Sequence, residues 1–166
     1  HFTSNTLTGS CKWDMLPDGW ALIDPGEARS GSPLADISAT PGIQRVGVAV
    51  QGSDDWHDAV VLTSTDVPDD MTDRQWLSAA VDESSRTLPG SYVVDVIPWS
   101  MDADTAIVAT LVSIVDGRSL TTFQWTWVAG EPRRVSYCLT GTCRTEDCGL
   151  ALDTFVDILG TIGEGQ

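Results

Sequence analysis

The sequence is short of positive charge, and this limits its partners. It carries nine lysines and arginines against 24 acidic residues, which gives a formal net charge of −15. Nucleic-acid binding depends largely on cationic side chains that neutralise phosphates, so this balance excludes a nucleic-acid partner and disfavours anionic lipid surfaces. An acidic surface can instead attract a basic protein at a high association rate.

Long apolar stretches are also missing. The longest one, residues 106–115, is interrupted by Thr110 and Ser113. It falls well short of the ~20 residues that span a bilayer. No secretory signal with a basic start, an apolar middle and a small-residue cleavage site is visible either. We expect no transmembrane segment in this chain, and a lipid or membrane anchor upstream of it stays open.

The sequence also lacks the motifs of common enzyme classes. Neither glycine-rich phosphate motif occurs, nor does the Gly-x-Ser-x-Gly turn of serine hydrolases. Histidine occurs twice, at His1 and His57, and His57 lies in an acidic, turn-like stretch over residues 54–58. A hydrolase would have to use His57 or an unidentified pair among the carboxylates. We therefore predict a non-enzymatic protein without a cofactor, with a hydrolase as the lesser alternative.

What the sequence does contain is enough apolar material for one folded domain. Of its 166 residues, 42% are hydrophobic and 20% are charged, a composition that excludes a disordered chain. No internal repeat is present, which excludes solenoids and propellers. We expect a polar N-terminal segment over residues 1–10, a single domain over residues 11–160 and a tail over residues 161–166.

Alternating apolar residues and turn signals predict a sheet with two helices. The expected strands cover residues 11–16, 20–23, 44–50, 59–65, 91–99, 105–115, 119–128 and 133–140. One helix follows a capping box of Thr72 and Gln75, and a second covers residues 148–159. This order predicts an α+β fold, an antiparallel sheet of about six to eight strands with two main helices packed on one face.

Several landmarks together resemble the PsbP-like superfamily, which includes actinobacterial LpqN-type lipoproteins and DcrB-related proteins. The landmarks are Leu16-Pro17-Asp18-Gly19-Trp20, Leu88-Pro89-Gly90, Phe123-Gln124-Trp125-Thr126-Trp127 and Tyr137-Cys138-Leu139-Thr140. The resemblance covers residues 11–160 and implies the fold just described. It also implies an extracytoplasmic accessory, binding or chaperone-like role in a bacterial cell envelope, with no catalytic residues to carry over.

The cysteines indicate a compartment. There are four, at Cys11, Cys138, Cys143 and Cys148. An even number in an acidic, lysine-poor chain favours two disulfides and an extracytoplasmic, oxidising location. We expect Cys11 to pair with Cys138, because both fall in predicted strands, and Cys143 to pair with Cys148 across one short loop. A structural zinc site and free buried thiols are the alternatives.

Acidic residues crowd the entrance to the first helix, at Asp66, Asp69, Asp70 and Asp73. Carboxylates at this end stabilise the helix dipole. A weak calcium site is the alternative interpretation, because calcium takes oxygen ligands. The sequence has no EF-hand loop, so the carboxylate density is the sole support for that site.

Seven tryptophans make aromatic contacts the main candidates for binding. Phe123, Trp125 and Trp127 alternate along one strand and therefore share one face. That face is core if it meets the helices, and a platform for a sugar, lipid or peptide if it is exposed. Trp56 and Trp99 adjoin turns and are better placed to be exposed.

Two adjacent arginines, Arg133 and Arg134, complete the candidate contacts. They either bind an acidic group or end a solvated hairpin. The sequence thus predicts a binding module for an unknown protein or a small apolar or sugar ligand. Its alternative is a protein–protein interaction module, such as a secretion accessory, a chaperone or an immunity protein, that binds a basic partner.

Overall fold

The structure, a computed structural model, describes residues 16–23, 42–50, 56–88, 90–101, 104–130 and 133–163. Its strands are β1 (Trp20–Ile23), β2 (Ile43–Ala49), β3 (Ala59–Asp66), β4 (Tyr92–Met101), β5 (Asp104–Val115), β6 (Arg118–Ala129) and β7 (Val135–Arg144). Its helices are α2 (Asp73–Thr87) and α3 (Cys148–Gly163), with the 3-10 turn η2 (Thr145–Asp147) before α3. The described residues form the predicted α+β fold. Apart from Leu16, the strand expected at residues 11–16 lies outside them.

All seven strands join one antiparallel sheet in the order β1-β2-β3-β7-β6-β5-β4. Strands β4 to β7 form a meander, and Asp116 and Gly117 both take positive φ angles in the β5–β6 hairpin. Strand β7 then pairs with β3, so that Thr63 lies opposite Cys138. This pairing brings segments distant in the sequence together at the centre of the sheet and leaves β1 and β4 as its edges.

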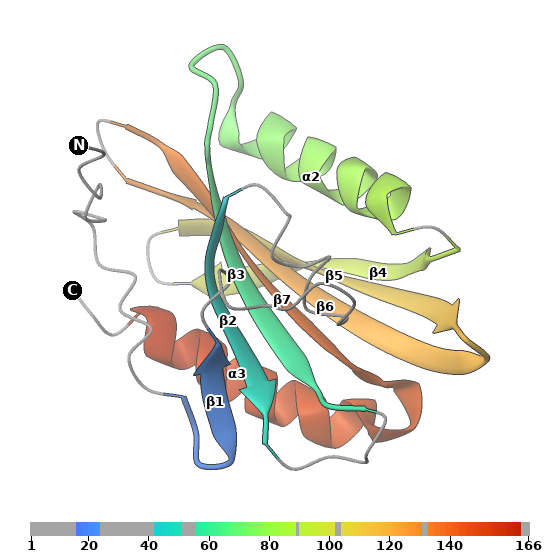
Figure 1. Ribbon diagram of the computed structural model, residues 1–166. Coiled ribbons are helices and arrows are strands. Elements are labelled where there is room, and N and C mark those ends of the chain that lie inside the picture. The colour runs from blue at the N-terminus through green and yellow to red at the C-terminus, as the bar shows by residue number, and fades with distance from the viewer. Residues whose placement is uncertain are drawn as a thin grey trace, which may run out of the picture.

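The main core lies between the sheet and α3 (Figure 1). Phe123, Trp125 and Trp127 of β6 all face this helix and are buried, which confirms their interpretation as core. Gly141 of β7 lies directly beneath Phe155 of α3. A Cβ atom on Gly141 would lie 2.6 Å from the Phe155 ring. The glycine therefore allows α3 to approach the sheet closely.

Helix α2 begins at the predicted capping box. The Thr72 hydroxyl accepts the Gln75 N–H at 3.2 Å, and the Gln75 side chain accepts the Thr72 N–H at 2.9 Å. The helix packs on the sheet through a small apolar cluster formed by Val67, Leu77 and Val128. Neither α2 nor α3 combines the length and the hydropathy of a membrane-spanning helix.

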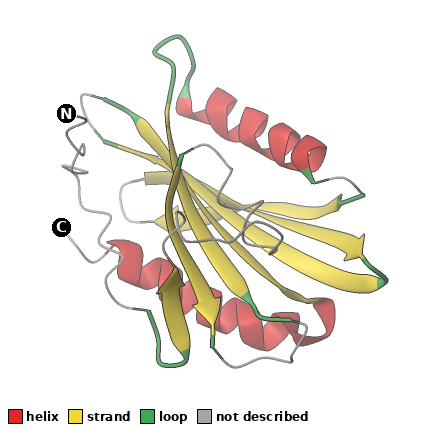
Figure 2. Ribbon diagram, in the orientation of Figure 1, coloured by secondary structure: helices red, strands yellow, loops and turns green. Residues whose placement is uncertain are grey.

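The two helices cover opposite faces of the sheet (Figures 1 and 2). The prediction that both pack on one face is therefore wrong. The physical reason lies in β6, whose two faces are both covered. Its Thr122 and Thr126 alternate with the aromatic residues, and their short side chains are buried as well.

Candidate functional site

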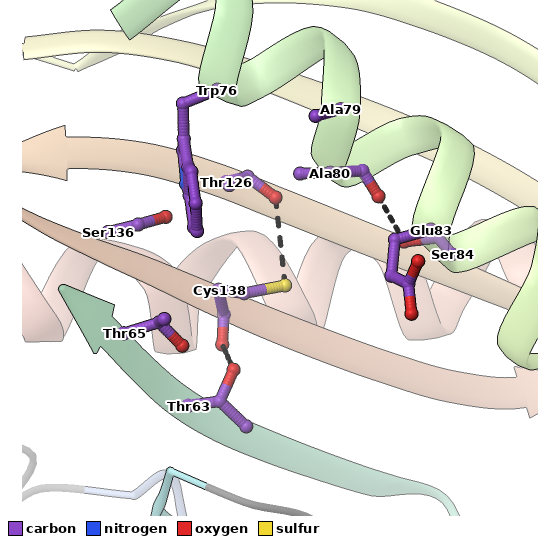
Figure 3. Close-up of a pocket in the computed structure, with 10 residues that line it drawn as sticks. All are labelled: Thr63, Thr65, Trp76, Ala79, Ala80, Glu83, Ser84, Thr126, Ser136 and Cys138. Atoms are coloured by element: carbon purple, nitrogen blue, oxygen red, sulfur yellow. Dashed lines mark hydrogen bonds between the residues drawn. The ribbon is translucent and has the colours of Figure 1, made fainter. Parts of the chain in front are cut away.

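A cleft opens on one flank of α2, between the helix and the sheet. Its volume is about 420 Å³, within the ~300–1,000 Å³ typical of ligand pockets. The cleft is lined by Thr63 and Thr65 of β3, by Trp76, Ala79, Ala80, Glu83 and Ser84 of α2, by Thr126 of β6, and by Ser136 and Cys138 of β7 (Figure 3).

The floor of the cleft is a row of short polar side chains. Antiparallel pairing places Thr63 opposite Cys138, and Cys138 opposite Thr126, so three neighbouring strands each contribute one residue. Thr65 lies opposite Ser136 in the next row. Hydroxyl groups both donate and accept hydrogen bonds, so this floor can bind polar groups of either kind.

Cys138 lies at the centre of the floor. The Thr126 hydroxyl donates to its sulfur at 3.6 Å, and the Thr63 hydroxyl donates to its backbone carbonyl at 3.5 Å (Figure 3). Burial raises the pKa of the Cys138 thiol, against the smaller opposing effect of its hydrogen bonds to hydroxyls. The thiol is therefore protonated and uncharged at neutral pH, and it is a poor nucleophile.

The roof of the cleft is one stripe of α2. Ala79 and Ala80 are short and leave space above the floor, and Trp76 extends from the helix toward β7 (Figure 3). Trp76 Nε1 is buried and has no hydrogen-bond partner within the described ranges. Glu83 is the one acidic residue of the lining. Its carboxylate is exposed and lies 3.8 Å from the Arg86 guanidinium. The interior of the cleft is therefore neutral.

Arg134 fixes the start of α2 over the sheet. Its guanidinium donates to the Asp73 carboxylate at 2.6 Å, to the Met71 carbonyl at 2.6 Å and to the Pro68 carbonyl at 3.0 Å. All three acceptors lie at the entrance to the helix or in its first turn. Arg134 thus ties the start of the roof to the segment that leads into β7.

The arrangement of these elements can be compared with solved structures. The crystal structure of LpqN, involved in cell envelope biogenesis of Mycobacterium tuberculosis, matches with a TM-score of 0.64 and 19% identity over 90% of this chain and 78% of that chain. The solution structure of cyanobacterial PsbP from Synechocystis sp. PCC 6803 matches with a TM-score of 0.53 and 12% identity over 87% of this chain and 81% of that one.

The fold is PsbP-like. A Pseudomonas aeruginosa protein of unknown function shares it, with a TM-score of 0.56 and 13% identity over 70% of this chain and 78% of the other. No family model matches the sequence. No curated protein matches it at a significant level. The PsbP-like arrangement is thus carried by topology, since the shared residues are few.

The acidic cluster does not converge on a metal. No group of three or more histidine, cysteine or carboxylate residues within the described ranges can hold an ion. Asp66 pairs with Arg133, and Asp73 pairs with Arg134. Asp69 and Asp70 are exposed. Two of the four carboxylates are thus bound to arginines, and the calcium site stays a prediction.

The tryptophan candidates separate into two groups. Trp125 and Trp127 are 0% and 3% exposed, so they are core residues and not surface contacts. Trp99 is half-buried and packs edge-on against Trp125, with ring centroids 6.0 Å apart. Trp56 is half-buried too, and its Nε1 donates to Asp58 at 2.9 Å. The cleft uses Trp76 of α2 instead.

The cysteines described, Cys138, Cys143 and Cys148, are free thiols in this structure. The expected pair Cys143–Cys148 is therefore unbonded, and Cys143 Sγ is directed to the Thr121 carbonyl at 3.7 Å. Cys11, the expected partner of Cys138, lies outside the described residues. Cys138 faces α2, whereas Cys143 packs against α3 on the other face of β7. A zinc site holding all four thiolates is thereby excluded.

Alkaline pH should destabilise the protein through Cys143. Burial raises the pKa of its thiol from 9.0 to about 12. Because the folded pKa lies above the unfolded one, the resulting stabilisation is complete below pH 9 and is lost as the pH rises toward about 12. We expect Tm to fall with pH more steeply in the wild type than in Cys143→Ala. Equal slopes in thermal melts across this range would contradict the prediction.

His57 is exposed, and its Nδ1 hydrogen-bonds to the Ala49 carbonyl at 2.9 Å. It lies outside the lining of the cleft. The floor residues, by contrast, were missed by sequence reasoning. A signal was present, because Thr122, Gln124 and Thr126 alternate with the aromatic residues of β6. Such a strand has one polar face, from which Thr126 lines the cleft.

Proposed function

We propose that this protein is a non-enzymatic, extracytoplasmic binding module of a bacterial cell envelope. Its ligand is a small, uncharged, hydroxyl-rich molecule of the sugar class, bound in the cleft beside α2. The observation that carries the proposal is the row of hydroxyl groups that forms the floor of the cleft beneath the indole of Trp76. Hydroxyl groups that a ligand covers keep their hydrogen bonds only where the ligand offers polar groups of its own.

The chemistry of the lining supports an uncharged ligand. The floor offers donors and acceptors but no charge, since burial keeps the Cys138 thiol protonated. The indole of Trp76 adds a flat apolar surface, which suits the apolar face of a sugar ring. The cell-envelope setting is supported by the fold shared with LpqN.

A second candidate function is a protein–protein interaction module for a basic partner. The net charge of −15 favours this function, because an acidic protein attracts a cationic partner over a distance. The two functions differ in salt dependence. Association with a basic protein weakens strongly with ionic strength, whereas binding of a neutral sugar in the cleft does not.

The test is calorimetric titration with neutral mono- and disaccharides. We expect binding by the wild type and none by Ala80→Leu, which fills the cleft while leaving every polar group in place. Ser85→Leu is the matched control, since Ser85 is exposed on the same helix outside the lining. Sugar affinity that is absent, or unchanged in Ala80→Leu, would refute the proposal.

A further inference from the structure

A second groove runs along the other flank of α2, between this helix and the edge strand β4. Its volume is about 490 Å³. The walls are largely apolar, with Leu77 and Val81 from α2, Val96 and Pro98 from β4, and Ile107 from β5. Helical spacing separates the two flanks. Residues 74, 77, 78, 81 and 82 face the groove, whereas residues 76, 79, 80, 83 and 84 face the cleft.

The groove has a positive end and a negative end. Arg74 lines one end and makes no ion pair within the part of the chain that the structure describes. It lies in the first turn of α2, where the helix dipole adds to its positive charge. Asp82 lines the other end, eight residues along the helix and therefore about 12 Å away. An apolar ligand with one terminal anion complements this polarity, with the anion at Arg74.

The strand that borders the groove is an exposed edge. Val93 and Val96 of β4 face the side of α2 and are 37% and 42% exposed. An edge strand presents backbone N–H and C=O groups that an extended peptide can use and an alkyl chain cannot. A bulge between Val93 and Asp95 interrupts the ladder, and Pro98 lacks an N–H. The stretch of β4 between the bulge and Pro98 is short. It can pair with the last few residues of a chain, but not with a long strand.

We propose that this groove binds the C-terminal segment of a partner polypeptide. The apolar side chains of that segment lie between α2 and β4, its backbone pairs with the short regular stretch of β4, and its terminal carboxylate binds Arg74. The Arg74 guanidinium neutralises the terminal carboxylate, because guanidinium groups form strong, charge-assisted hydrogen bonds with carboxylates. This site is distinct from the cleft, because the two are lined by opposite flanks of the helix.

The probe is the N-acetylated peptide AVAVL, prepared with a free C-terminal carboxylate and as the C-terminal amide. Fluorescence anisotropy of a labelled form gives the affinities, and backbone NMR shifts locate the site. We expect the free acid to bind about tenfold more tightly than the amide. The Arg74→Gln variant should bind both forms equally. Arg86→Gln, a change of equal charge on the same helix outside the groove, should keep the tenfold preference.

Several results would overturn the proposal. Equal affinity for acid and amide in the wild type would remove the role of the carboxylate. A preference for the acid retained in Arg74→Gln would show that Arg74 does not bind it. Shifts confined to residues outside α2, β4 and β5 would place the peptide elsewhere. Decanoate binding more tightly than the peptide would assign the groove to an acyl chain. None of these outcomes bears on the sugar titration, since Ala80→Leu alters the other flank.

Discussion

Replacing Phe155 with alanine is expected to lower the free energy of unfolding by about 3–5 kcal/mol. Phe155 is fully buried at the centre of the interface between α3 and the sheet. Its ring packs edge-on against Trp20 and Phe123, with centroids 6.2 Å from each. It also lies against the backbone of Gly141, where no side chain is present to move into the space left behind. The cavity would therefore remain largely unfilled.

Chemical denaturation followed by tryptophan fluorescence and circular dichroism measures this loss. Leu150→Ala is the matched control, because Leu150 is on the same helix and is 79% exposed. That control should change the free energy of unfolding by less than about 0.5 kcal/mol. If Phe155→Ala were as mild as Leu150→Ala, the packing of α3 on β7 described above would be incorrect.

Replacing Arg134 with alanine is expected to cost about 1.5–3 kcal/mol, the range for hydrogen bonds made by a charged group. The side chain is 27% exposed and binds the Asp73 carboxylate and two backbone carbonyls. Its loss leaves those acceptors without their donor and loosens the first turn of α2. Arg134→Lys should recover little of the loss, since a single ammonium cannot reproduce the forked geometry of the guanidinium.

Arg133 provides the comparison for this prediction. It pairs with Asp66, but the two side chains are 70% and 59% exposed, so solvent screens the pair. Arg133→Ala should therefore cost no more than about 1 kcal/mol. The measurement is urea denaturation of the three variants beside the wild type. Equal destabilisation by the Arg133 and Arg134 substitutions would show that Arg134 does not fix α2.

Much of the fold could be predicted from local sequence. Alternating apolar residues and the Asp116-Gly117 hairpin signal identified β4 to β7, and the capping box located the start of α2. The end of α3 could not be placed in this way. Gly160 resembles a helix stop, yet the helix continues to Gly163 because Ile162 is buried in the core. Tertiary burial outweighs the low helix propensity of glycine there.

The candidate site was harder to predict than the fold. Its floor depends on the pairing of β3 with β7, which joins residues 63 and 138 that are far apart in the chain. Its roof depends on which face of the sheet α2 covers, and local periodicity does not encode that choice. Arg133 and Arg134 look alike in the sequence. Only the position of α2 makes Arg134 an anchor and leaves Arg133 at the surface.

Helix α2 is a wall shared by the cleft and the groove, and this has a thermodynamic consequence. The helix forms a wall of both pockets, so an occupant that displaced it toward β4 would widen the cleft and narrow the groove. An occupant that moves the helix in either direction therefore changes the affinity of the opposite flank. The effect is reciprocal, because each occupant alters the other's binding free energy by the same amount. A single helix between two pockets thus suffices for heterotropic cooperativity, with its sign set by the direction of the shift.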